Sequence, residues 1–337
     1  LYSQVLANSS IHWEEIEQFN AGVDVSLLNS RINVSLDGYI KNTNSMLVKA
    51  AFPITTGFED TFDTYINAGK VRNLGWELTA NSVNLTGELG WETNLTVTYS
   101  DTPLWRNQFG GAYATMLAAD FPMNVFYGYV TDGVFQTADE IRTHAVQPGA
   151  EPGDIRFRDL NNDGVINDDD RTVIGNPNPT WLFSMNNRFT YKGFELSIFL
   201  QGVAGNKIYN RTRSAMESMS AAYNQYASTA DRWTGPGTSF EMPRAVWADP
   251  NGNNRISDRW VENGAYLRLK NITLAYNFPA RLLDRIGFEQ ARVIFSCENV
   301  ATITGYKGLD PEVGIDGIDY SSFPPARTFN VGLSFNF

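Results

Sequence analysis

In several segments of this chain, apolar and polar side chains alternate strictly. This alternation constrains the fold more than any other feature of the sequence. The clearest such segment is residues 327–337, RTFNVGLSFNF, in which every second residue from Phe329 onward is apolar. Successive residues of a β-strand point to opposite faces of the sheet, so this segment has one apolar face and one small polar face. The apolar face must either contact lipid or cover a protein core.

The same alternation predicts three hairpins before this last strand. Their turns are short and contain residues suited to tight turns, as at Asn29-Ser30 and Lys192-Gly193. Single strands are predicted over 265–278 and 293–297, which gives about nine or ten strands in all. The hairpins pair 21–27 with 32–41, 74–81 with 89–99, and 181–191 with 194–200.

Long connections alternate with the short turns. They span about 42–70, 101–179, 204–263 and 301–326. Outer-membrane barrels have short turns at one end and long extracellular loops at the other, and polar side chains recur on the second face here as on a watery lumen. The pattern therefore favours a transmembrane β-barrel over a soluble β-sandwich. No apolar run of about 18 residues is present, which excludes a transmembrane helix.

Four local signals give finer expectations. The apolar residues of the strand fall on odd-numbered positions before Lys270-Asn271 and on even-numbered positions after it, which predicts a β-bulge there. Pro279 opens a short helical turn, and a second helix is expected near Ser214–Ala230. Thr137 and Glu140 form a capping box at the start of a third helix.

Composition and charge exclude several classes of function. The net charge of −11 argues against nucleic-acid binding. The single cysteine, Cys297, excludes an internal disulfide and is expected to be a small strand residue. His12 and His144 have no nucleophile–base motif around them, and no pair of catalytic carboxylates can be assigned. We therefore expect no enzymatic activity.

One motif suggests a metal site. Residues 159–170, DLNNDGVINDDD, have oxygen-bearing side chains at the ligand positions of an EF-hand calcium loop and Gly164 at the sharp turn. The motif predicts a structural Ca²⁺, with Mg²⁺ as the alternative ion, because Asp replaces the usual Glu at the last position. A polar turn without metal is the other reading. The predicted ligands are Asp159, Asn161, Asp163, the carbonyl of Val165, Asn167 and Asp170.

Aromatic residues are frequent in the long connections. Exposed rings can stack on sugars or pack against a partner protein, although loop aromatics often only pack the loop itself. The residues expected to contact a substrate or a partner are Trp105, Tyr113, Tyr127, Trp233, Trp247 and Tyr306.

The chain as a whole resembles the C-terminal part of the SusC/RagA-type TonB-dependent outer-membrane transporters of Bacteroidetes. The Asp-rich loop and the GAYLRLKN run are the most specific elements of this resemblance. The matching stretches are Trp13-Glu14 to Gly38-Tyr39, residues 67–77 (NAGKVRNLGWE), 132–135 (DGVF), 152–156 (PGDIR) with 159–170, 175–179, 191–205 (YKGFELSIFLQGVAG), 264–278 (GAYLRLKNITLAYNF), Asn299 and 308–312 (GLDPE).

The resemblance implies the C-terminal portion of a 22-stranded barrel in the outer membrane, with the plug domain and the first strands lying outside this chain. It implies active import of oligosaccharides, or alternatively of peptides, powered by TonB-ExbB-ExbD. A SusD-like surface lipoprotein would cover the extracellular loops, so that the segments 42–70, 101–179, 204–263 and 301–326 would contact this lid and part of the substrate. A passive porin and a soluble carbohydrate-binding β-sandwich remain the competing hypotheses.

Overall fold

The computed structural model describes residues 8–50, 64–101, 104–105, 115–116, 121–283 and 287–337. Its main element is a ten-stranded antiparallel sheet, in which nine long strands are paired in chain order and the short β5 pairs with β3. The predicted all-β barrel wall is therefore confirmed. The long strands are β1 (Glu15–Leu27), β2 (Ile32–Ala50), β3 (Thr64–Leu85), β4 (Leu89–Asp101), β11 (Trp181–Tyr191), β12 (Phe194–Ala204), β15 (Tyr266–Asn277), β16 (Gln290–Thr304) and β17 (Thr328–Asn336), and β5 is Leu104–Trp105.

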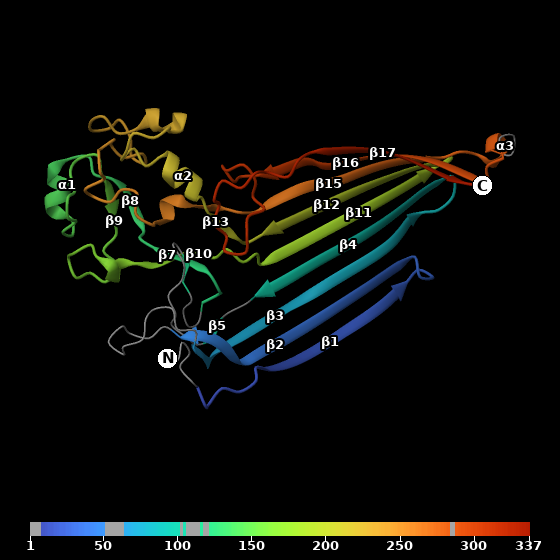
Figure 1. Cartoon of the computed structure of the whole chain (residues 1–337), viewed down its shortest axis with the longest axis horizontal. Coiled ribbons are helices and arrows are strands. Elements are labelled where there is room, and N and C mark those ends of the chain that lie inside the picture. The colour runs from blue at the N-terminus through green and yellow to red at the C-terminus, as the bar shows by residue number, and fades with distance from the viewer. Residues whose placement is uncertain (1–7, 51–63, 102–103, 106–114, 117–120, 284–286) are drawn as a thin grey trace, which may run out of the picture.

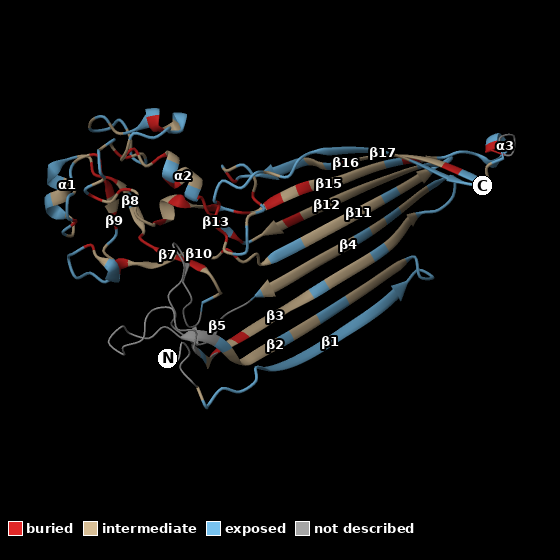
Figure 2. Ribbon diagram, viewed as in Figure 1, coloured by how far each residue is buried: buried red, intermediate tan, exposed pale blue. Residues whose placement is uncertain are grey.

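Short turns lie at one end of this curved sheet and long connections at the other (Figure 1). The long connections fold into a separate body at one end of the sheet, which we call the loop module and define as the described residues of 115–180, 205–265 and 305–327. Buried residues gather in the loop module, whereas the sheet is mostly exposed or intermediate (Figure 2). None of the described helices is long and apolar enough to span a membrane.

One face of the sheet is charged. Arg188 of β11 lies 3.5 Å from Glu92 of β4 and 3.2 Å from Glu195 of β12, and Arg292 of β16 lies 3.3 Å from the same Glu195. The two pairs of Arg188 join neighbouring strands and the pair of Arg292 reaches across β15, and all three lie on the face opposite the apolar side chains. Charged groups need water or partners, so this face is suited to line an aqueous lumen.

The other face is apolar and has two groups of aromatic rings. Toward the loop module, the ring centroids of Trp76 and Tyr99 lie 5.6 and 5.0 Å from that of Trp181. Toward the turns, Trp91 stacks on Phe189 at 5.6 Å. Tyr99 follows Trp91 by eight residues on β4, or roughly 26 Å along the strand at roughly 3.3 Å per residue. Outer-membrane barrels have such aromatic girdles flanking an apolar band about 25 Å tall.

The predicted turns and bulge are present. Asn29 and Ser30 both have positive φ, as do Lys192 and Gly193, which is the geometry of tight hairpin turns. The register of β15 shifts next to Lys270 against both of its neighbours. The bulge accounts for the change of apolar parity along that strand.

Two expectations about local structure were wrong. The segment 42–70 is not an irregular loop in its described part, because β2 continues to Ala50 and β3 begins at Thr64. Register shifts between Thr43 and Leu47, with positive φ at Ser45, interrupt the alternation there and hide the strands in the sequence. The helix expected near Ser214–Ala230 consists of two short pieces, separated by a segment in which Met219 has positive φ.

The last strand pairs with β16 as predicted, with Val293 opposite Leu333 and Cys297 opposite Phe329. Its second edge has no hydrogen-bonded neighbour among the described strands, and neither does the second edge of β1. Phe288 packs on Phe335 and Phe337 at the turn end, next to α3 (Ala280–Leu283) (Figure 1).

Short elements build the loop module. Three small sheets pair β10 with β7 and β6, β13 with β14, and β8 with β9. The elements are β6 (Thr115–Met116), β7 (Val125–Gly128), β8 (Thr131–Val134), α1 (Ala138–Thr143), β9 (Ile155–Phe157), η2 (Asp168–Asp170), β10 (Thr172–Gly175), β13 (Lys207–Tyr209), α2 (Arg211–Met216), η3 (Ala227–Asp231), η4 (Asp258–Trp260) and β14 (Val261–Asn263).

Candidate binding surface on the loop module

Two hydrophobic clusters form the core of the loop module, whose parts 115–180, 205–265 and 305–327 we call the first, second and third connections. The first joins Phe126, Tyr209, Trp260 and Ile318, which come from all three connections and are each at most 3% exposed. The second lies within the first connection and is built around Phe157. Burial of large aromatic side chains is worth roughly 1.5–3 kcal/mol each, so the module has its own core.

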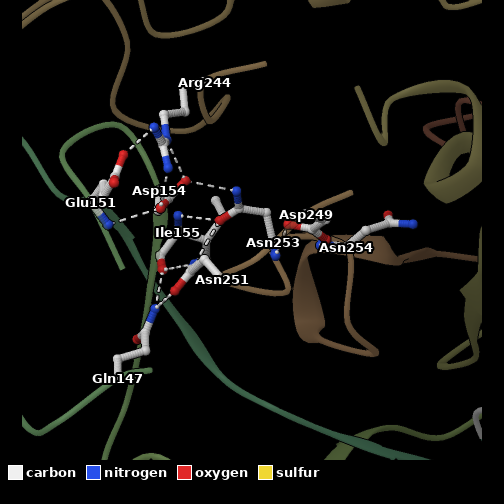
Figure 3. Close-up of polar contacts among 9 residues, drawn as sticks. All are labelled: Gln147, Glu151, Asp154, Ile155, Arg244, Asp249, Asn251, Asn253 and Asn254. Atoms are coloured by element: carbon white, nitrogen blue, oxygen red, sulfur yellow. Dashed lines mark hydrogen bonds and ion pairs between the residues drawn. The ribbon is translucent and has the colours of Figure 1, made fainter. Parts of the chain in front are cut away.

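A buried polar network links the first two connections (Figure 3). Asp154 is fully buried, and its two oxygens accept from Nε and Nη2 of Arg244 at 2.8 and 3.1 Å. Its Oδ1 also accepts from the Asn253 amide at 2.9 Å. The hydrogen bond that Arg244 donates to Asp154 raises the pKa of Arg244 above its usual value. A buried carboxylate paired and hydrogen-bonded in this way fixes the relative position of the two connections.

The same network replaces a missing strand neighbour beside β9. The Oδ1 atom of Asn253 accepts from the backbone N–H of Ile155 at 2.7 Å, and the Asn251 and Gln147 amides donate to the carbonyl of Ile155 at 3.2 and 2.7 Å. Side-chain amides thus satisfy backbone groups that a sheet partner would otherwise pair. The PGDIR motif and the Asn-rich segment at 249–254 therefore form one structural unit.

A second arginine joins the sheet to the third connection. Arg268 of β15 is 1% exposed and donates from Nη1 to Glu312 at 2.7 Å and from Nη2 to both oxygens of Asp310 at 2.7 and 2.8 Å. Its Nε donates to Thr302 of β16 at 3.0 Å. The GAYLRLKN and GLDPE runs are thus the two halves of one ion-pair cluster.

The loop module contains a cavity of about 850 Å³, which is the size of a small-molecule binding site. Arg213 lies on its wall and is ion-paired with Glu217 at 3.0 Å and Glu262 at 2.9 Å. Burial opposes the charge of Arg213, but these two carboxylates raise its pKa above the usual value. The cavity is lined by Thr131, Gly133, Ile155, Arg213, Glu217, Ser228, Asp231, Thr238, Ser239, Phe240, Glu241, Met242, Arg259 and Lys307.

The predicted metal loop forms a chain of side-chain-capped turns. Both oxygens of Asp159 accept backbone N–H groups, from Asn162 at 2.7 Å and Gly164 at 2.8 Å. Those of the buried Asp170 accept from the N–H groups of Leu160 and Asn167 at 2.8 and 2.9 Å. These bonds hold the loop around the carboxylates at its first and last ligand positions. Each of these carboxylate oxygens has a further lone pair for a cation.

Among the described residues, however, no three His, Cys, Asp or Glu side chains are grouped closely enough to hold a metal by themselves. The hydrogen bond from the backbone N–H of Val165 lowers the pKa of Asp163 below its usual range. A cation here would need amide, carbonyl and carboxylate oxygens together, which is the mixed donor set that the sequence predicts.

The predicted contact aromatics differ widely in exposure. Trp247 is 73% exposed, whereas Tyr306 is 6% exposed and donates its hydroxyl hydrogen to Asp319. Trp233 is half-buried against the second hydrophobic cluster and donates to Gln136 at 3.2 Å. The guanidinium carbon of Arg171 lies 4.9 Å from the ring centroid of Tyr127. Tyr306 and Trp233 therefore pack the module, which leaves Trp247 as the exposed candidate.

Two other predicted contacts cannot be placed in this way. Tyr113 lies outside the described residues, and Trp105 is described only as a strand residue of β5 opposite Lys70. Conversely, the sequence alone did not single out Arg259 or Asp154. Only the PGDIR motif could have pointed to Asp154, and no spacing signal marks Arg259.

The comparisons with known proteins agree with this architecture. The family model described as TonB dependent receptor-like, beta-barrel matches residues 1–300. TonB-dependent receptor P3 of Formosa agariphila is 30% identical over 98% of this chain and 35% of its own length. TonB-dependent receptor SusC of Bacteroides thetaiotaomicron is 27% identical over 98% of this chain and 32% of its own length. The chain thus spans about a third of the length of these relatives.

A solved structure has the same fold. The structure of the RagAB peptide transporter superposes with a TM-score of 0.84 at 22% identity, covering 98% of this chain and 36% of that chain. The family match agrees with the structure, in which the strands are paired in chain order and the sheet has an apolar outer face and a charged inner face. The chain belongs to the TonB-dependent receptor-like β-barrel family of outer-membrane proteins.

Proposed function

We propose that this chain forms part of a transporter that imports oligosaccharides across the outer membrane in a TonB-dependent manner. The observation that carries the proposal is the combination of a barrel wall, apolar outside and charged inside, with a folded loop module at one end. A wall of this kind encloses an aqueous path, and a module with its own core can present a defined surface to cargo and partners. The loop module would then lie on the extracellular side.

The proposed partners follow from the same arrangement. A SusD-like surface lipoprotein would cover the loop module, and the TonB-ExbB-ExbD system would act through the part of the transporter outside this chain. Trp247, exposed on the module, is suited to contact the lid or the cargo. The outer apolar face would contact outer-membrane lipid.

Peptides are the second candidate cargo. The likeness to the RagAB peptide transporter, at a TM-score of 0.84, favours this alternative. Both cargoes are polar and larger than the solutes of small porins, so the barrel wall itself does not discriminate between them.

Uptake by cells with the intact transporter tests the proposal. Cells with and without the transporter gene would be given fluorescent oligosaccharides or oligopeptides, with and without a protonophore. We expect uptake of one class that depends on the gene, on the proton-motive force and on the lipoprotein. Gene-dependent uptake that is insensitive to the protonophore would indicate a passive porin and contradict the proposal.

We further propose that residues 159–170 bind a structural Ca²⁺. Support comes from the ligand spacing, from Gly164 at φ 84°, and from the carboxylates of Asp159 and Asp170 bound to backbone N–H groups of the loop. The ion would neutralise these carboxylates and brace η2, where Asp168 accepts a hydrogen bond from Tyr129 at 3.0 Å. Its role is structural and involves no reaction.

A further inference from the structure

The cavity in the loop module contains an arginine whose charge is not neutralised. Arg259, in η4, is half-buried on the cavity wall. Its guanidinium carbon lies 4.2 Å from the ring centroid of Trp260, and its Nη2 lies 3.0 Å from the sulfur of Met242. Thioether sulfur is a weak acceptor, so most of the five guanidinium donors lack a strong partner.

Three other arginines with little solvent exposure differ from Arg259 in this respect. Arg213, Arg244 and Arg268 each have two carboxylates within ion-pair distance. No carboxylate of the described residues lies within ion-pair distance of the Arg259 guanidinium. An arginine withdrawn from water without a counter-ion is costly, and proteins usually provide a partner.

Burial, together with the neighbouring Arg213, lowers the pKa of Arg259 to about 10, although Glu217 and Asp249 oppose the shift. The side chain is therefore still protonated at neutral pH, but its charge is under-compensated. Glu217 cannot neutralise it fully, because that carboxylate already accepts from Arg213 at 3.0 Å and from Ser228 at 2.7 Å.

The remaining charges on the wall decide which ligand would fit. Lys307 lines the cavity without a carboxylate partner among the described residues, but it is exposed, so water solvates its charge, and its backbone N–H donates to Glu262. Asp231 and Glu241 also line the cavity, but both residues are exposed, so water already solvates their carboxylates. The charge on the cavity wall that lacks both water and a counter-ion is therefore the positive charge of Arg259.

We propose that this cavity binds a small ligand that carries a carboxylate, and that the carboxylate pairs with Arg259. The planar guanidinium group can donate two parallel hydrogen bonds to a carboxylate. Its contact with the Trp260 ring fixes its orientation. A volume of about 850 Å³ accommodates a short oligosaccharide or peptide around that group. The hydroxyls of Thr238 and Ser239 add polar contacts for such a ligand.

Two sources could supply this chemistry, namely an acidic sugar of an oligosaccharide or the free C-terminus of a peptide. The inference rests on the proposed function only in taking the ligand from the cargo. Binding to the purified protein is measured separately from uptake by cells. A failure of binding therefore leaves the uptake result standing, and a failure of uptake leaves binding standing.

Calorimetry on the intact, detergent-purified transporter tests the site. The probes are a glucuronic-acid-terminated disaccharide against its glucose-terminated counterpart, and a tripeptide with a free C-terminus against the C-terminal amide. Tighter binding of either carboxylate probe than of its neutral counterpart supports the site and identifies the source. Equal affinities within both pairs would overturn the proposal.

Variants assign the effect to the arginine. Arg259→Gln keeps donors but removes the charge, and we expect carboxylate affinity to fall by about 10- to 100-fold, as for loss of a hydrogen bond to a charged group. Arg259→Lys keeps the charge without the fork and should retain part of the affinity. The matched control is Arg232→Gln, at an exposed residue outside the cavity, which should bind like the wild type. Unchanged binding by both Arg259 variants would reject the assignment.

Discussion

Arg268 and Asp310 lie 42 residues apart in the chain, yet Nη2 of the arginine donates to both carboxylate oxygens of the aspartate at 2.7 and 2.8 Å. The arginine belongs to a strand of the barrel wall and the aspartate to the third long connection. Because Arg268 is 1% exposed, this contact anchors the loop module to the wall through a buried charge pair.

Removal of this anchor gives the first prediction. Arg268→Gln leaves Asp310 and Glu312 without their cation, and breaking a buried pair in this way costs about 3–5 kcal/mol. We expect segment 305–327 of the intact protein to become sensitive to protease at lower temperature. The control Arg281→Gln changes an exposed arginine at the turn end and should leave the cleavage pattern unchanged. Equal protease resistance of both variants would contradict the anchoring role.

The polar network of the first two connections gives the second prediction. Asp154→Asn keeps the shape of the side chain but removes the charge that Arg244 pairs with at 2.8 Å. Loss of hydrogen bonds to a charged group costs roughly 1.5–3 kcal/mol. Hydrogen exchange of the Ile155 amide in the intact protein should therefore accelerate. Asp139→Asn, at a side chain 77% exposed, is the control and should exchange like the wild type.

Lipid exposure of the apolar face gives the third prediction. Leu333 lies on that face of β17, opposite Val293. An arginine on the lipid face near the bilayer midplane costs about 2–4 kcal/mol, so Leu333→Arg should lower the free energy of unfolding in lipid vesicles by about that amount. Asn330→Arg places the same charge on the polar face, opposite Ser296, and should change the stability little. Equal losses in the two variants would argue against the assignment of the faces.

The pH dependence of the loop module gives the fourth prediction. Burial raises the pKa of Tyr306, and the hydrogen bond to Asp319 raises it further. A tyrosine whose pKa is higher in the folded state stabilises fully below its unfolded value, about 10, and loses this contribution as the pH rises above it.

Alkaline titration of the wild type and of Tyr306→Phe checks the direction of this pH dependence of stability. The wild-type module should lose stability as the pH rises above about 10, while the variant should show a weaker dependence. Below that pH the variant should be less stable by about 1–3 kcal/mol, because Asp319 then lacks a buried donor. Tyr223→Phe, at a residue 77% exposed, serves as the control. A wild-type profile that is flat through the alkaline range would contradict the expectation.

Much of the barrel wall could be predicted from the sequence, because each strand and each tight turn is indicated by residues that are adjacent in the chain. Alternation identifies a strand wherever one face is apolar, and the Lys192-Gly193 turn fixes the register of β11 against β12. The ends of β2 and β3 escaped prediction because bulges between Thr43 and Leu47 break the alternation.

The loop module could not be predicted because its contacts are distant in sequence. Gln147 and Asn251 meet across 104 residues, and neither residue type signals its partner. Arg259 shows the same limit for the candidate site, because an arginine without a counter-ion can be recognised only after every neighbour is placed. The Asp-rich loop is the exception, since all of its predicted ligands lie within twelve residues.

That locality makes the calcium proposal directly testable. If residues 159–170 bind Ca²⁺, the double variant Asp159→Ala with Asp163→Ala should retain less calcium after dialysis of the intact protein, as measured by mass spectrometry. The control is Asp169→Ala, an exposed residue at a position that is not a predicted ligand. Because Asp159 also caps two backbone N–H groups, loss of the turns could by itself loosen the module.

Chelation separates these two effects. Removal of calcium from the wild type leaves the caps of Asp159 intact, so any loosening reports the ion alone. We expect a chelator to increase protease cleavage within 159–170, calcium to reverse it, and magnesium to reverse it less if the loop is large enough for seven oxygens. The double variant should be cleaved equally with and without the chelator. Calcium content that is the same in the double variant and the wild type would reject the site, whatever happens to cleavage.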